Sequence, residues 1–286
     1  MLSIMSESAM FERIAAAVNL RRILRFTSEL LPARCCLCGA RGGTPGLDLC
    51  ADCADALPWS DIAITRTSQL NAVLAPLRYE FPVDQLVRAL KYRGEAVYAR
   101  VLGELLARKI QQRCGLDEGC RLPELVLPVP LHRARHRERG FNQAAEIARH
   151  VAARLRVPFA PRAVERLLAT RSQTALSPAE RRRNVRCAFG IATGRVGSAL
   201  QGVRHVAIVD DVVTTGSTAD ELARVLRAQG VQIIELWVAA RALSPGTSGD
   251  HASGPKRVFE QDADEHGQAS KIVVAKGAKA AVSVSI

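Results

Sequence analysis

Short apolar runs alternate with amphipathic stretches through the middle of the chain. The runs are rich in Val, Ile and Leu and are four to nine residues long, which is typical of strands buried in a parallel sheet. Between them, apolar residues recur at helical spacing. We expect strands at 73–79, 125–130, 206–209 and 232–240, two helices within 81–113, and helices at 142–155 and 219–228. This alternation predicts an α/β fold with a mostly parallel sheet flanked by helices.

The two ends of the chain differ from this middle part. Residues 1–32 carry apolar side chains at helical spacing, but Arg21, Arg22 and Arg25 interrupt them. We therefore expect an amphipathic helix that packs on protein, with membrane-surface contact as the alternative. The sequence has no run of about 18 uncharged apolar residues, so we expect a protein that does not span a membrane. Residues 243–286 are rich in Ser, Gly, Asp and Lys and are expected to be disordered.

Five of the eight cysteines fall between residues 35 and 53. Cys35 and Cys38 form one Cys-x-x-Cys pair, and Cys50 and Cys53 form another, which is the spacing of a zinc ribbon. A closed set of four sulfurs predicts a structural Zn²⁺ in a small domain at 33–60. Cys36 leaves two alternatives open, because it either replaces Cys35 as a ligand or is a free thiol. Redox-active or disulfide-forming pairs are the other interpretation of this pattern.

The strongest chemical signal follows the apolar run at 206–209. Asp210 and Asp211 come where we expect this strand to end, and a hydroxyl-rich loop then leads into the helix expected at 219–228. The loop consists of Thr214, Thr215, Gly216, Ser217 and Thr218. N–H groups and hydroxyls at a helix N-terminus favour an anion, whereas paired carboxylates need hydroxyl groups or a metal. A ribose 5-phosphate meets both needs, with its phosphate in the loop and its hydroxyls on the carboxylates.

This run resembles the phosphoribosyl pyrophosphate (PRPP) signature of type I phosphoribosyltransferases, which has four apolar residues, two acids and a Thr-Gly turn. The resemblance implies a Rossmann-like type I phosphoribosyltransferase domain, which we place at 70–242. It implies that Asp210 and Asp211 are catalytic and hold the ribose hydroxyls of PRPP, that the loop at 214–218 binds its 5-phosphate, and that Mg²⁺ accompanies it. The alternative is an ordinary strand, an Asp-rich turn and a Ser or Thr N-cap.

The chain carries a formal net charge of +12, from 40 basic and 28 acidic residues, which suits a phosphorylated substrate, a nucleic acid or both. Part of this charge follows the strand expected at 125–130, where Arg135, Arg137 and Arg139 fall in an expected loop. Such loops bind anions in α/β folds, and pyrophosphate is the second anion that PRPP brings. A solvated basic loop is the alternative.

Lys91 and Arg93 stand in the last turn of an expected helix that ends at Gly94. Two interpretations remain open for these cations. They complement the negative end of the helix dipole, or they bind an anionic substrate.

Two further runs carry a more specific resemblance. PVPLHRARHRERGFNQA at 128–144 and RSQTALSPAERRRNVRCAF at 171–189, together with the cysteine pairs ahead of them, resemble the ComF family of bacterial proteins associated with DNA uptake. The resemblance covers about residues 33–242. In type I phosphoribosyltransferases a mobile loop often closes over PRPP, and we expect Gln173, Arg181 and Asn184 to belong to that lid or to the second-substrate pocket. A basic surface hairpin is the alternative.

These resemblances imply a cytoplasmic bacterial PRPP-binding protein of the ComF type that acts in natural transformation. Two functions remain open. In one, the protein transfers phosphoribose to a nitrogen nucleophile and releases pyrophosphate. In the other, it is a non-catalytic, zinc-dependent module that binds single-stranded DNA or a competence helicase, with PRPP as a ligand or regulator.

Overall fold

A computed structural model describes residues 34–41, 46–60, 67–117, 119–168 and 187–242 of the 286-residue chain. The helix expected at 1–32 and the disordered tail expected at 243–286 lie outside these ranges. The chain divides into two compact units. The first contains the described residues up to Ala54, and the second contains those from Asp55 onward.

The first unit is a small cysteine-rich fold. Arg34 and Arg41 form an antiparallel bridge, and the turn between them is closed by a hydrogen bond from the Gly39 N–H to the Cys35 carbonyl. Gly39 has a φ of 71°, a left-handed conformation that favours glycine at this tight turn. The second turn leads into helix α2 (Ala51–Asp55). This unit buries few large side chains, among them Leu37 and Leu49, so its stability requires more than a hydrophobic core.

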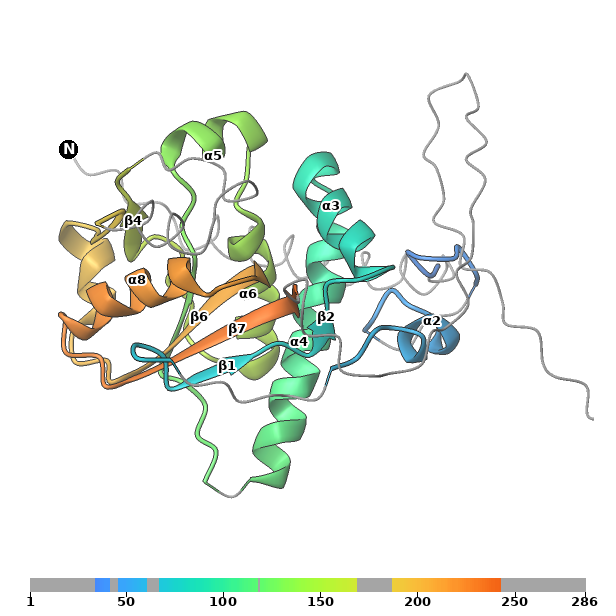
Figure 1. The fold of residues 1–286 in the computed structure, drawn as a ribbon, viewed down its shortest axis with the longest axis horizontal. Helices are drawn as coiled ribbons and strands as arrows, with labels where there is room; N and C mark the ends of the chain where they lie inside the picture. Colours follow the sequence, from blue (N-terminus) through green and yellow to red (C-terminus); the bar gives the residue numbers. More distant parts are fainter. Residues whose placement is uncertain (1–33, 42–45, 61–66, 118, 169–186, 243–286) are drawn as a thin grey trace, which may run out of the picture. The chain divides into compact units, whose positions relative to one another are not determined.

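A parallel sheet in the order β1-β7-β6-β3 forms the centre of the second unit (Figure 1). Its strands are β1 (Ala72–Leu74), β3 (Leu125–Pro128), β6 (His205–Val213) and β7 (Ile233–Arg241), and β2 (Leu77–Arg78) also pairs with β7. Every pairing in this sheet is parallel. The apolar half of β6 is completely buried, as expected of a strand covered on both faces. The predicted α/β fold class is thereby confirmed.

Helices cover both faces of the sheet (Figure 1). The helices among the described residues of this unit are α3 (Val83–Arg93), α4 (Ala96–Leu116), α5 (Arg133–Arg139), α6 (Gln143–Leu155) and α8 (Ser217–Arg227). On one face, Leu222 and Leu226 of α8 share a hydrophobic cluster with Ile208 and Leu236 of the sheet. Successive side chains of a strand point to opposite faces, so Glu235 points away from that cluster, and there it meets an arginine of α4.

Smaller elements complete the second unit. Strands β4 (Val164–Arg166) and β5 (Phe189–Ile191) form an antiparallel pair, and a 3-10 helix, η2 (Gly194–Leu200), precedes β6. A disulfide joins Cys114 to Cys120 at the end of α4. Within the described ranges, none of the helices combines the length and the apolar composition that a membrane span needs.

Two expectations about local structure need correction. The segment at 133–139 is the helix α5 and not a loop, although none of its residues is buried. The strand expected at 206–209 extends to Val213, because Asp210, Val212 and Val213 stay paired with β7. The two carboxylates therefore belong to the last part of a strand and are held by its backbone.

Candidate functional site

Four cysteine sulfurs form a compact cluster in the first unit. The Sγ atoms of Cys35, Cys38, Cys50 and Cys53 all lie within 4.8 Å of one another, and those of Cys38 and Cys50 are 3.7 Å apart. Four sulfurs at about 2.3 Å from a tetrahedral Zn²⁺ are about 3.8 Å from each other. Cys36 does not belong to this group. The donor set and its spacing thus fit Zn²⁺.

The electrostatics of the cluster also favour a cation. Burial raises the pKa of Cys35, but backbone hydrogen bonds from Cys38, Cys50 and Leu37 outweigh it and lower the value to about 7. Burial and the neighbouring sulfurs raise the pKa of Cys53, and burial raises that of Cys50. One thiolate therefore forms readily and opposes the ionisation of the others. A divalent metal at the centre would remove this repulsion.

The second unit places two carboxylates at the carboxyl end of β6. The Asp211 N–H donates to Oδ1 of Asp210 at 2.9 Å, and the Val212 N–H donates to Oδ1 of Asp211 at 2.9 Å. Each carboxylate is thus oriented by the next peptide, which leaves its Oδ2 to interact with other groups. Burial, followed by the charge of Asp211, raises the pKa of Asp210 well above its ordinary value.

A hydroxyl-lined loop follows these carboxylates and starts α8. Gly216, with a φ of 77°, is the residue before the helix, and Ser217 is its first residue. The Ser217 side chain is buried, and its Oγ lies 3.1 Å from Oγ1 of Thr215. The loop encloses a cavity of about 70 Å³, whose lining includes Asp210, Thr214, Gly216, Ser217 and Thr218. A small anion in this cavity would meet the N-terminus of an eleven-residue helix.

Lys91 connects α3 to the carboxylates. Its Nζ lies 2.5 Å from Oδ2 of Asp211, and the two side chains are 25% and 13% exposed. Burial lowers the pKa of Lys91, but the charges of Asp211 and Asp210 outweigh this and raise it. Lys91 is therefore a permanent cation, and its nearest anion is a residue that we expected to hold ribose.

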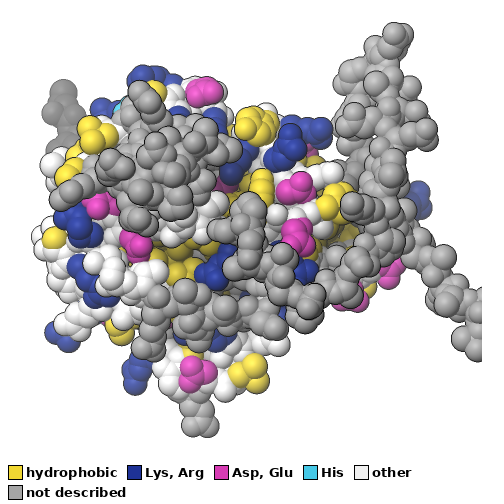
Figure 2. All heavy atoms as spheres, viewed as in Figure 1, with side chains coloured by type: hydrophobic (Ala, Val, Ile, Leu, Met, Phe, Trp, Pro, Cys, Tyr) yellow, Lys and Arg dark blue, Asp and Glu magenta, His cyan; other side chains and the backbone are white. Residues whose placement is uncertain are grey.

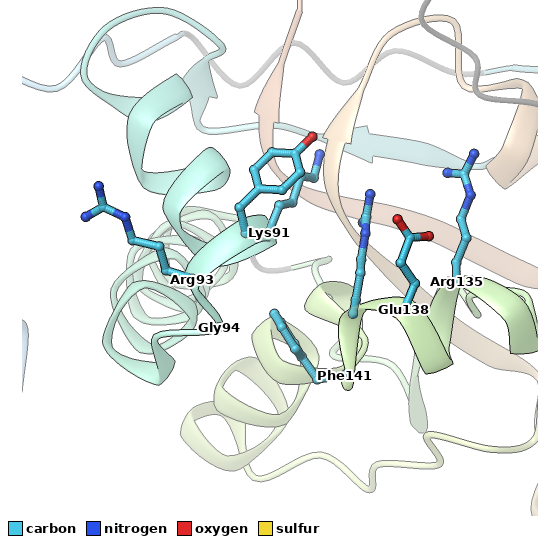
Figure 3. Close-up of a pocket in the computed structure, with 8 residues that line it drawn as sticks. Lys91, Arg93, Gly94, Arg135, Glu138 and Phe141 are labelled. Carbon is cyan, nitrogen blue, oxygen red and sulfur yellow. The ribbon is translucent and has the colours of Figure 1, made fainter. Parts of the chain in front are cut away.

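A larger pocket of about 470 Å³ opens between α3 and α5. Figure 3 shows Lys91 and Arg93 on one side of it and Arg135 and Glu138 on the other. The remaining lining residues are Tyr92, Gly94, Arg139 and Phe141. Figure 2 shows Lys and Arg side chains gathered on this part of the molecule, near α3 and α5. Four cations against one carboxylate favour an anionic occupant.

The arginines expected to bind pyrophosphate do not all face this pocket. Arg135 and Arg139 line it, whereas Arg137 is exposed and is not among the lining residues. Positions 135 and 139 are four residues apart and share one face of α5, from which position 137 is turned away. The helical form of this segment thus separates three arginines that a loop could have brought together.

Arg166 is a further residue near the site, and no motif in the sequence points to it. It ends β4, and its guanidinium lies 5.4 Å from the centre of the Phe189 ring. Burial lowers its pKa, as does the charge of Arg135, while the charge of Asp210 acts in the opposite direction. After Lys91, Arg166 is thus a second cation that lies close enough to interact electrostatically with the carboxylates. The residues expected in a lid, Gln173, Arg181 and Asn184, lie outside the described residues.

No protein-family model matches the chain, but the similar proteins are all competence or DNA utilization proteins. The chain is 35% identical to Competence protein F of Haemophilus influenzae over 164 residues, which cover 57% of this chain and 70% of that protein. It is 32% identical to DNA utilization protein YhgH of Escherichia coli O157:H7 over 213 residues, which cover 73% and 90% of the two chains. The YhgH protein of Escherichia coli K12 is 36% identical over 165 residues, or 58% and 70%. The chain therefore belongs to the ComF family of competence and DNA utilization proteins.

Proposed function

We propose that this protein binds PRPP at the carboxyl end of β6 and acts in the uptake or use of DNA. One observation carries the first part of this proposal. Asp210 and Asp211 each anchor Oδ1 on the next backbone N–H, and a hydroxyl-lined cavity at the N-terminus of α8 follows them. A ribose 5-phosphate carries two neighbouring hydroxyl groups and a phosphate. The two carboxylates can accept hydrogen bonds from the hydroxyls, and the cavity can bind the phosphate.

The pyrophosphate of PRPP would occupy the pocket between α3 and α5. Arg135 and Arg139 line that pocket, and Lys91 links it to Asp211. Within the described ranges, no cluster of carboxylates is arranged to hold a metal ion, and the one group of metal donors is the four cysteines. We therefore expect Mg²⁺ to arrive with PRPP, bound to its phosphate oxygens, and assign it no ligand from the protein.

If the site is catalytic, a nitrogen of the acceptor forms a bond to C1 of the ribose as the bond from C1 to pyrophosphate oxygen breaks. Positive charge develops on the ribose ring and negative charge on the leaving group. The ionised Asp211 lies where it would stabilise the first, and Arg135 and Arg139 lie where they would stabilise the second. Placement of charge is then the main contribution of the protein to the rate.

The role in DNA metabolism rests on the relatives. The similar proteins are a competence protein and DNA utilization proteins, and the chain carries a net charge of +12. The outer face of α5 exposes Arg133, His136 and Arg137, a basic surface that suits a phosphodiester backbone. This observation favours the second candidate function, in which the protein binds single-stranded DNA or a helicase partner and PRPP serves as a ligand or regulator.

The zinc site and the domain limits are part of the same proposal. Cys35, Cys38, Cys50 and Cys53 would hold a structural Zn²⁺, and Cys36 would not be a ligand. The zinc ribbon would occupy residues 33–60 and the phosphoribosyltransferase-like domain residues 70–242. The metal would stabilise a segment that has little core of its own.

A pyrophosphate-release assay separates the two functions. A transferase releases pyrophosphate from PRPP when a nucleobase or single-stranded DNA is added, and Asp211→Ala abolishes the release. A DNA-binding module releases none, and it binds DNA with an affinity that falls with salt, survives Asp211→Ala and is lowered in the double variant Arg133→Ala/Arg137→Ala. Release that does not depend on an acceptor or on Asp211 would count against the transferase.

A further inference from the structure

Lys91 is paired with the oxygen of Asp211 that a ribose hydroxyl would need as its acceptor. Asp211 uses Oδ1 to accept a hydrogen bond from the Val212 N–H, so Oδ2 is the oxygen left for a ligand. That atom is paired with Lys91 Nζ at 2.5 Å. A ribose hydroxyl can approach Oδ2 of Asp211 closely when the ammonium group moves away or turns toward another anion.

Apart from the two carboxylates of β6, the described residues near Lys91 offer it little negative charge. Lys91 is itself part of the lining of the pocket between α3 and α5, where its cationic neighbours are Arg93, Arg135 and Arg139. The one carboxylate among the lining residues is Glu138, which is on the opposite side of the pocket from Lys91 (Figure 3). An ammonium group that left Asp211 for this pocket would meet repulsion unless an anion were present there.

The position of Lys91 is also well defined. It lies in the last turn of α3, which ends at Gly94 with a φ of 67°. A Cβ at Gly94 would lie 3.3 Å from Cε1 of Phe141, a residue that follows α5 in the chain and lines the same pocket. The end of α3 therefore packs closely against Phe141. Because Lys91 both pairs with Asp211 and lines the pocket, its side chain can exchange one anion for another without a movement of the helix.

We propose that Lys91 is a specificity residue that exchanges Asp211 for the pyrophosphate group of the ligand, so that the site selects a ribose phosphate that carries pyrophosphate over one that lacks it. This inference rests on the proposed PRPP site. With PRPP, the pyrophosphate occupies the cationic pocket and accepts the ammonium group, and Asp211 is freed for the ribose. Ribose 5-phosphate places no anion in the cationic pocket, so Lys91 stays paired with Asp211. The ribose hydroxyls must then compete with Lys91 for Oδ2 of Asp211.

The test compares PRPP with ribose 5-phosphate on two variants of Lys91. Lys91→Met removes the charge and keeps most of the side-chain volume, and Lys91→Arg keeps the charge. The matched control is Arg88→Met, which removes one cation from an exposed position of the same helix. Each protein is titrated calorimetrically with both ligands in the presence of Mg²⁺, after its zinc content and thermal midpoint have been measured.

We expect Lys91→Met to weaken PRPP binding by about 10- to 100-fold, the effect of losing a charge-assisted hydrogen bond. Its affinity for ribose 5-phosphate should stay within about threefold of that of the control, because loss of the ion pair frees Asp211. Lys91→Arg should keep the ratio of the two affinities within about threefold of wild type, and this variant carries the test if the methionine variant does not fold.

Three results would overturn the inference. Equal weakening of both ligands by Lys91→Met would mean that Lys91 contributes general attraction or structure. An unchanged affinity for PRPP would mean that it does not contact pyrophosphate. A collapse of the affinity ratio in Lys91→Arg would mean that the charge of Lys91 does not produce the selection. Failure of the proposed function has a different signature, because the wild-type protein would then bind neither PRPP nor ribose 5-phosphate.

Discussion

Replacing Asp210 by Asn should stabilise the ligand-free protein, whereas the same change at Asp211 should destabilise it. The two side chains are neighbours in the sequence but differ in their surroundings. Asp210 is buried beside a like charge, which raises its pKa well above the ordinary value. Asp211 is paired with Lys91. An Asn at position 210 keeps the Oδ1 atom that accepts from the Asp211 N–H, so the substitution removes the ionisable group and little else.

The expected sign follows from proton linkage. The folded protein binds the Asp210 proton more tightly than the unfolded chain, so stability falls as pH rises from the unfolded pKa through the folded one. At neutral pH we expect Asp210→Asn to raise the free energy of unfolding by about 1–2 kcal/mol, a size common among single substitutions, with a rise in Tm of about 2–4 °C for each kcal/mol. Near pH 4 the gain should vanish.

Asp211→Asn should lower the free energy of unfolding by about 1 kcal/mol, because it leaves a half-buried Lys91 without its counter-ion. The assay is thermal or chemical unfolding of zinc-loaded protein between pH 4.5 and 8. Each variant is compared with wild type at the same pH, so that the pH dependence of the cysteine cluster cancels. Changes of the same sign in both variants, or a gain for Asp210→Asn that does not depend on pH, would refute the reasoning.

Two further predictions concern the cysteines and the phosphate loop. Cys38→Ser should lose bound zinc and Cys36→Ser should retain about one equivalent, as measured by elemental analysis of purified protein; retention by the first or loss from the second would contradict the assigned ligands. Gly216→Ala should cost about 1 kcal/mol, because alanine is strained at a φ of 77°, and should also weaken ribose 5-phosphate binding severalfold. Gly202→Ala, at a φ of 75° with open space around its Cβ, should cost a similar amount in unfolding experiments and leave ligand binding unchanged. Equal effects of the two alanines on ligand affinity would count against a role of the loop in binding phosphate.

Much of the fold could be predicted because the sheet is parallel and buried on both faces. Its strands are then continuous apolar runs such as 206–209, which differ clearly from the amphipathic helices between them. The end of β6 was harder to place, since polar residues usually mark the end of a strand. Asp210 and Asp211 remain within the strand because Asp210 and, after Asp211, Val212 stay paired with β7.

Helix α5 was missed for a related reason. Helix prediction relies on an apolar face, and α5 has no buried residue. Its ends are nevertheless well marked, since the His132 side chain accepts a hydrogen bond from the Ala134 N–H and Gly140 adopts the left-handed conformation. Of these two, the glycine is a capping signal that can be read from the sequence. The many arginines of this segment instead favoured its interpretation as a cationic loop.

The contacts of the candidate site could be predicted only in part. Asp210, Asp211 and the hydroxyl loop are contiguous, so a local pattern reveals them. The pairing of Lys91 with Asp211 joins residues 120 positions apart in the chain, and no local pattern records it. The same holds for Arg166, whose place near Asp210 depends on how β4 lies beside the sheet.

Calorimetric titration of the zinc-loaded protein with PRPP and Mg²⁺ tests the central claim most directly. The account predicts saturable binding of about one PRPP per chain. Binding should be lost in Asp211→Ala and kept in Asp117→Ala, which removes an equal charge from an exposed position at the end of α4. Absence of PRPP binding to the wild-type protein, or binding that Asp211→Ala leaves unchanged, would contradict the account.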